Sequence, residues 1–323
     1  GGRGQCFFEQ RIESHGAYSS CHNAAPRTAM QPYPALRERL DRGERVVLDG
    51  PMGSELVRHG VRWADNGFRT NADQVTALHQ EYLDAGADVL RTNTFQLNRR
   101  VYQNVFRDTA HMRHIGAPDL DARVPRIIGR AVEVARAARD RAGRLEVPIA
   151  GVMSPLEHCF RPDLAPSFEE ALPEHTEIAR LLAQAGVDFL LLESMNTVRE
   201  AQAALRAAQL TGLPVWVSFV VGSDGRVLSG EPIPQLAADA MLVNCAPPED
   251  IQGALAQAPW LSGAYPHIGR FDPPSWKFEF FPQFTCTESW PAERYAAAAR
   301  AWNVQLVGGC CGITPEHIKA LKS

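Results

Sequence analysis

The stretch VGGCCGITPEHI, residues 307–318, joins an apolar run to a helix start and sets two adjacent cysteines among three glycines. Thr314 followed by Pro315 is typical of the first turn of a helix. Adjacent cysteines seldom bridge each other, because a disulfide needs a wider separation of the two Cα atoms than one peptide bond allows. Three interpretations therefore stay open for the thiols: a metal site, a redox pair, or a glycine turn in which they are incidental.

The strand–turn–helix pattern of this stretch recurs along the chain. Near-continuous apolar runs, typical of parallel strands covered on both faces, alternate with amphipathic segments. Eight such units predict the α/β class and a single (β/α)8 TIM barrel, with a doubly wound sheet as the structural alternative. The predicted strands are residues 45–50, 88–95, 147–152, 188–194, 215–221, 240–246, 261–269 and 304–312.

One connection departs from this pattern. GSDGRVLSGEPIPQLAAD, residues 222–239, contains two prolines and three glycines between the fifth and sixth predicted strands. Both residue types disfavour a helix interior. We expect a short or irregular helix there.

Composition limits the classes of partner. The chain has 323 residues, a length suited to one barrel, and is 45% hydrophobic and 22% charged, as globular proteins are. A net charge of -4 gives no indication of a nucleic-acid or acidic-membrane partner. No apolar run reaches the roughly 18 residues of a membrane span. We expect small-molecule substrates as partners, and a homo-oligomer remains an open alternative.

Residues 1–29 differ from the rest of the chain. They show no sustained period and lack the apolar core of a secretory signal, whereas Met30 opens a stretch that resembles a natural N-terminus. We expect a poorly ordered extension at 1–29, with a transit peptide as the alternative, and a barrel domain at 30–323. Seven scattered cysteines without a secretory signal predict a reducing compartment, taken here as the cytoplasm.

Active sites of such barrels collect at the carboxyl ends of the strands. Cys245 lies at the carboxyl end of the sixth predicted strand, and Cys310 and Cys311 lie at that of the eighth. A catalytic zinc ion takes three protein ligands and keeps one open position, so these three thiols are candidate ligands. The flanking glycines Gly308, Gly309 and Gly312 are expected to permit the turn through positive φ angles.

Two alternatives compete with a catalytic metal. The GGCCG loop with Thr314 as helix N-cap could cradle a phosphate, since barrels bind phosphate near the seventh and eighth strands. That interpretation leaves the cysteine after the sixth strand unexplained. A non-catalytic zinc-binding barrel, or a redox barrel that uses Cys310 and Cys311 as a dithiol, is the other alternative.

Further polar residues follow the other strands. Asp49, Thr94 and Glu193 lie at the carboxyl ends of the first, second and fourth predicted strands. Asn244 and Tyr265 lie in the carboxyl halves of the sixth and seventh. His158 and Cys159, after the third strand, are expected to line the wall of the site. The loop after the seventh strand carries aromatic residues that suit a cationic donor or pack over the mouth: Phe271, Trp276, Phe278, Phe280, Phe281, Phe284 and Trp290.

Five segments carry a resemblance to a known family. LDGPMGSEL at 48–56, RTNTFQ at 91–96, LLLES at 190–194, LVNCAPPE at 242–249 and VGGCCGITPEHI together resemble the homocysteine S-methyltransferase family. The resemblance runs from about residue 44 to the C-terminus, in the family's order. The combination of NC with GGCCG is the specific part, and the other segments are individually weak. Pro51, in the first glycine turn, departs from the small residues usual there.

The resemblance implies a zinc-dependent (β/α)8 barrel without a folate or cobalamin domain. It assigns the zinc ligands to Cys245, Cys310 and Cys311. It makes Asp49 and Glu193 catalytic residues that hold the amino-acid head group. The substrate-binding residues that it implies are Asp49, Gly50, Thr94, Glu193, Asn244 and Tyr265.

The activity implied is zinc-dependent methyl transfer from a sulfonium or quaternary-ammonium donor to the thiol of homocysteine, which gives methionine. A free thiol has a pKa near 8.5 and is mostly protonated at neutral pH, so a bound metal would be needed to hold it as the thiolate. The sequence leaves the donor, and whether homocysteine is the true acceptor, undetermined.

Overall fold

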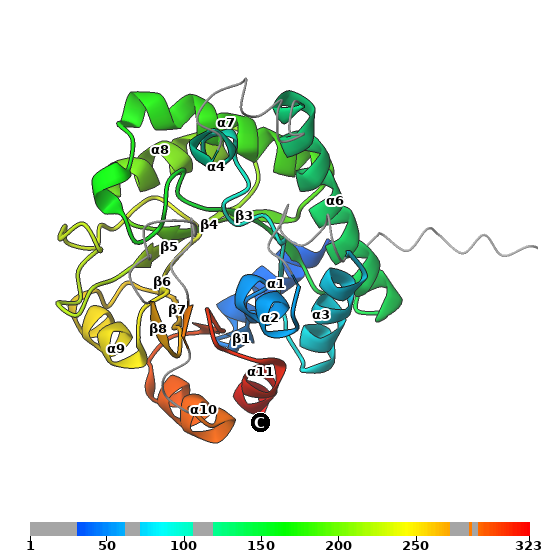
Figure 1. Ribbon diagram of the computed structural model, residues 1–323. Helices are drawn as coiled ribbons and strands as arrows, with labels where there is room; N and C mark the ends of the chain where they lie inside the picture. Colours follow the sequence, from blue (N-terminus) through cyan, green and yellow to red (C-terminus); the bar gives the residue numbers. More distant parts are fainter. Residues whose placement is uncertain (1–30, 62–71, 106–118, 272–283, 286–289) are drawn as a thin grey trace, which may run out of the picture. The chain divides into compact units, whose positions relative to one another are not determined.

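The computed structural model describes residues 31–61, 72–105, 119–271, 284–285 and 290–323 (Figure 1). The extension predicted at 1–29 lies outside the described residues. Within 31–323, eight parallel strands form one sheet in the order β1-β10-β7-β6-β5-β4-β3-β2. Their bounds are Val46–Val47 (β1), Leu90–Arg91 (β2), Ile149–Met153 (β3), Phe189–Met195 (β4), Val215–Val220 (β5), Ala240–Asn244 (β6), Gly263–Tyr265 (β7) and Leu306–Val307 (β10).

The two outer strands of this order meet and close the sheet. Leu48 and Val89 form a parallel bridge that joins β1 to β2. The backbone N–H of Asp49 donates to Val89 O at 3.1 Å, and that of Asp88 donates to Val47 O at 2.7 Å. The predicted (β/α)8 barrel is therefore confirmed. Every predicted strand is present, although β1, β2 and β10 keep only two residues each.

Helices lie outside the strands in Figure 1. Helix α7 shows why a segment becomes one of them. At its start, the Ser167 side chain accepts from the Glu170 N–H, and the Glu170 carboxylate accepts from the Ser167 N–H. At its end, Gly186 takes the left-handed conformation that terminates the helix. The helices are α1 (Pro32–Asp41), α2 (Gly53–Arg58), α3 (Ala72–Asp84), α4 (Arg99–Val105), α6 (Leu120–Arg141), α7 (Phe168–Ala185), α8 (Val198–Gln209), α9 (Pro248–Gln257), α10 (Ala292–Ala301) and α11 (Pro315–Lys322).

The connection between β5 and β6 contains no helix. Residues 221–239 are all described, and they form turns with a single bridge between Val221 and Val227. Pro232 and Pro234 lack the backbone N–H that helical hydrogen bonds require. Gly225 and Gly230 have positive φ, which a right-handed helix does not allow. The expectation of a short or irregular helix is corrected to an irregular loop.

The barrel interior is closed at its amino end by α1. Tyr33 and Leu36 of this helix belong to the same buried cluster as Phe189 and Trp216, which stand at or near the starts of β4 and β5. The indole Nε1 of Trp216 donates to the Tyr33 hydroxyl at 3.1 Å. The amino end of the barrel interior is thus filled with side chains, which leaves the carboxyl end for the polar groups of a site. In the described ranges, no helix combines the length and hydropathy that crossing a bilayer requires.

Candidate active site

Three thiols meet at the carboxyl end of the barrel. The sulfur atoms of Cys245, Cys310 and Cys311 all lie within 4.8 Å of one another, and those of Cys310 and Cys245 are 3.2 Å apart. A Zn–S distance of about 2.3 Å in a tetrahedral site puts sulfurs roughly 3.8 Å apart. Cys245 and Cys310 are buried and Cys311 is half-buried. The donor set and spacing therefore fit one zinc ion with an open position.

The backbone explains how these cysteines converge. Cys245 has a φ of 54°, a left-handed conformation that turns its side chain out of the strand direction at the end of β6. In the GGCCG loop, only Gly312 has positive φ. Gly308 and Gly309 serve close approach, since a Cβ on Gly309 would lie 2.2 Å from the Ile313 side chain. The expectation that all three glycines supply positive φ is corrected.

Four amides of this loop already have acceptors. The N–H of Gly309 donates to Asp49 O, that of Cys310 to Pro266 O at 2.9 Å, and that of Ile313 to Cys310 O at 3.1 Å. The Gly312 N–H donates to the Ser54 hydroxyl. A phosphate cradle needs such donors free. The loop geometry thus favours thiol chemistry over anion binding.

A buried arginine links the predicted carboxylates. Arg91, at the end of β2, donates from Nε to Asp49 Oδ1 and from Nη1 to Glu193 Oε1, at 2.6 Å each. Its Nη2 donates at 2.7 Å to the backbone oxygens of Asp49 and Gly309, and its guanidinium lies 5.0 Å from the Tyr265 ring centroid. Arg91 therefore joins strands β1, β2 and β4 to the cysteine loop.

The charges in this cluster depend on one another. Burial disfavours the charged form of Arg91, but the adjacent Glu193 and Asp49 outweigh it and raise its pKa well above its ordinary value. Burial also raises the pKa of Asp49 and of Glu193, and Arg91 offsets part of that rise. In this buried cluster two carboxylates share one guanidinium. One carboxylate charge is therefore left without a matching cation.

The two carboxylates differ in access. Asp49 has no exposed surface, and each of its side-chain oxygens accepts from Arg91. The Glu193 side chain is 11% exposed, and in the described part of the chain only its Oε1 has a hydrogen-bond partner. A register shift in β4 between Leu192 and Met195, with Ser194 at a φ of 62°, re-aims the strand at this point.

The remaining predicted substrate-binding residues are buried supports of the site. The Thr94 hydroxyl donates to Val152 O at 2.7 Å, and the Asn244 side chain bridges the hydroxyls of Ser218 and Ser194, also at 2.7 Å. Gly50 lies against Tyr82, whose ring a Cβ would meet at 2.5 Å. Tyr265 packs its buried ring beside Arg91.

The loop after β3 brings a fourth thiol close. Cys159 is buried in the same cluster as the three cysteines. Its hydrogen-bond contact with Cys245 contributes most to raising the pKa of the Cys245 thiol. Burial, with Arg161 nearby, lowers the pKa of His158 to about 4, so its ring is neutral at pH 7. The wall role predicted for His158 and Cys159 stays a prediction.

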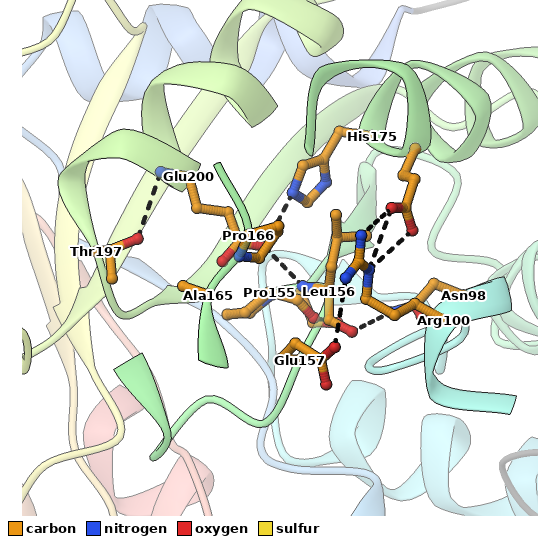
Figure 2. Close-up of polar contacts among 12 residues, drawn as sticks. Asn98, Arg100, Pro155, Leu156, Glu157, Ala165, Pro166, His175, Thr197 and Glu200 are labelled. Carbon is orange, nitrogen blue, oxygen red and sulfur yellow. Dashed lines mark hydrogen bonds and ion pairs between the residues drawn. The ribbon is translucent and has the colours of Figure 1, made fainter. Parts of the chain in front are cut away.

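A polar network holds this loop in place (Figure 2). Fully buried Glu200 of α8 accepts from the Leu156 N–H at 2.7 Å and contacts His175 of α7 at 3.3 Å. Asn98 donates to Leu156 O, and Arg100 pairs with Glu174 and Glu157. Three neighbouring helices thus fix the loop that carries Cys159.

Most of the aromatic loop predicted after the seventh strand lies outside the described residues, namely Trp276, Phe278, Phe280 and Phe281. Phe271 and Phe284 pair in a short antiparallel hairpin of β8 (Arg270–Phe271) and β9 (Phe284–Thr285). Trp290 lies under the Arg294 guanidinium, 3.9 Å from the ring centroid.

Arg91 is the functional candidate that sequence reasoning missed. Its signal was present, because DVLRTNTF sets one cation inside an apolar run. A buried charge must find a partner, so this residue could have been used to predict an ion pair at the barrel mouth.

Comparisons with known proteins agree with this site. The family model described as Homocysteine S-methyltransferase matches residues 46–323. The chain is 27% identical to the homocysteine S-methyltransferase YbgG of Bacillus subtilis, over 88% of this chain and 96% of that protein. It is 26% identical to betaine–homocysteine S-methyltransferase 1 of Rattus norvegicus, over 92% of this chain and 76% of that protein.

Among solved structures, the fold is similar to the homocysteine methyltransferase MmuM of Escherichia coli in its metallated form. That match has a TM-score of 0.67 at 24% identity and covers 89% of this chain and 98% of the other. The matched model spans the whole barrel from β1 to α11. The predicted family and class of enzyme are confirmed, and the chain belongs to the homocysteine S-methyltransferase family.

Proposed function

We propose that this enzyme transfers a methyl group from a sulfonium or quaternary-ammonium donor to the thiol of homocysteine and so forms methionine. The observation that carries the proposal is a buried three-thiol cluster at the barrel mouth, close to a carboxylate with an open oxygen. The names of the relatives, which include a betaine-dependent enzyme, support the two substrates as partners.

Cys245, Cys310 and Cys311 would hold a zinc ion, since their sulfur atoms lie together, and the Escherichia coli relative was solved in a metallated form. Zinc bound by three thiolates would keep a substrate thiol deprotonated at neutral pH. The open fourth position is where the acceptor sulfur would enter.

The chain's own residues would align the acceptor. Glu193 Oε2 would accept from the ammonium group of homocysteine, which fixes the direction of the thiol relative to the cysteines. Asp49 is closed off by Arg91, so we assign it a positioning role, in place of the direct head-group contact expected from the sequence. The buried residues Thr94, Asn244 and Tyr265 would hold the surrounding strand ends in place.

A donor screen tests the proposal. Protein purified without chelator is incubated with homocysteine and, separately, S-methylmethionine, S-adenosylmethionine or betaine, and methionine is measured by mass spectrometry. We expect donor-dependent methionine from one of the three and about one zinc per chain. Zinc-loaded protein that methylates no thiol with any of them would contradict the proposal. Oxidation of homocysteine to its disulfide by dissolved oxygen, without a donor and faster than in the absence of the protein, would instead support the dithiol alternative.

A further inference from the structure

The arginine at the barrel mouth bears on the choice of acceptor. We propose that Arg91 is a specificity-determining residue: it is a resident cation between Asp49 and Glu193, and it weakens the requirement for an α-amino group on the acceptor thiol. The acceptor class widens to short thiol carboxylates that lack an ammonium group. This inference rests on the proposed function, because it concerns the acceptor of the same reaction.

Asp49 is unavailable to any ligand ammonium. Its Oδ1 accepts from Arg91 Nε at 2.6 Å and its Oδ2 from the Arg91 backbone N–H at 2.9 Å. The residue has no exposed surface. An entering ammonium group could reach it only by displacing the side chains that cover it, in a dry site where an unpaired charge is costly.

Glu193 is shared rather than free. Its Oε1 accepts from Arg91 Nη1 at 2.6 Å, and its side chain is 11% exposed. An ammonium group at the other oxygen would lie close to a guanidinium of the same sign, and like charges repel more strongly in a buried site than in water. A single weakened contact is therefore the most that the acceptor's amino group can make here.

Arg91 is held too firmly to swing away. Four hydrogen bonds from its side chain end on Asp49 Oδ1, Glu193 Oε1, Asp49 O and Gly309 O, and Tyr265 flanks the guanidinium. The bond to Gly309 O, one residue before Cys310, also sets the position of the cation relative to the thiol cluster. The same side chain thus fixes both the charge and the cysteine loop.

The expected effect follows from the strength of charge-assisted contacts. One such contact is worth roughly tenfold to a hundredfold in affinity. Without Arg91, two carboxylates would face the ammonium with no competing cation. The preference for an α-amino thiol should then rise by at least about tenfold.

A matched pair of thiols tests this inference. Homocysteine and 4-mercaptobutyrate differ only in the α-amino group, and their dissociation constants from the zinc-loaded protein are measured by calorimetry, which needs no methyl donor. The preference is the dissociation constant of 4-mercaptobutyrate divided by that of homocysteine. This preference is compared among the parent protein, Arg91→Gln and Arg39→Gln. The last variant is the control, because Arg39 also pairs with two carboxylates but lies at the amino end of the barrel.

We expect a preference below about tenfold in the parent and in Arg39→Gln, and an increase of at least about tenfold in Arg91→Gln. The comparison within one protein sample cancels any loss of folded or metal-loaded fraction. An unchanged or lower preference in Arg91→Gln overturns the inference. If Arg91→Gln does not fold, the parent alone decides, and a preference above about tenfold overturns it.

The two proposals fail separately. Methylation of either thiol by the parent protein keeps the proposed function, whatever the preference is. If both thiols bind but neither is methylated with any donor, the proposed function fails, while the measured preference still decides the role of Arg91.

Discussion

Two arginine clusters stand at opposite ends of the same barrel. At the amino end, Arg39 donates to Glu44 at 3.0 Å and to Asp88 at 3.1 Å, and Lys322 also donates to Asp88. Arg42 also pairs with Glu44, so three cations face two carboxylates there, and the Arg39 side chain is 29% exposed. At the carboxyl end, Arg91 is the one cation among the described residues that pairs with Asp49 and Glu193, and it is almost completely buried.

The difference separates a structural use of charge from a functional one. A partly hydrated network in which both carboxylates are paired adds little to stability and asks for no ligand. A buried cluster with an unmatched carboxylate oxygen costs free energy unless something else satisfies it. Since Glu193 keeps such an oxygen beside three thiols, the carboxyl end is suited to a charged ligand and the amino end is not.

The largest expected effect comes from breaking the thiol cluster. Cys310→Ser removes one of the three proposed ligands, so bound zinc and methyl transfer should both fall by more than about a hundredfold, since even changes beyond the ligands cost roughly 10–100-fold. Metal analysis and the methionine assay measure the two quantities. Cys6→Ser and Cys286→Ser, at positions outside the described residues, should leave both unchanged. Full zinc content in Cys310→Ser would rule out the assigned ligand set.

A second measurement sharpens the contrast between the arginines. Arg91→Gln leaves buried Asp49 and Glu193 without their cation, so the free energy of unfolding should fall by about 3–5 kcal/mol. Arg39→Gln removes a partly hydrated pair and should cost about 0–1 kcal/mol. Urea unfolding at one pH and one zinc concentration compares them. Equal losses would mean that burial does not distinguish the two clusters.

The smallest effect is expected for the N-terminal extension. Residues 1–29 carry no pattern that could bury an apolar face, so a chain that starts at Met30 should melt within about 5 °C of the parent. Differential scanning calorimetry measures the shift. A much larger decrease would place a stabilising contact of the barrel in residues 1–29 and would move the predicted domain boundary.

From the sequence by itself we predicted the number of strands and their order along the chain, the family, and the three cysteines of the candidate metal site. These features depend on local patterns: apolar runs with the length of buried strands, glycine turns, and thiols directly after the sixth and eighth strands. Because parallel strands end at one rim, position along the chain made Cys245, Cys310 and Cys311 candidates for one site, and the family resemblance assigned them as ligands.

Only the tertiary structure decided which charges pair. Arg91 reaches Asp49 across 42 residues and Glu193 across 102, and which side chain meets which depends on strand stagger and on the irregular step in β4. The loop at 221–239 and the close packing of Gly309 on Ile313 also depend on neighbours distant in sequence or on the shape of a turn. Local patterns place residues at the rim, but contact distances between side chains from different strands decide which carboxylate stays open to a ligand.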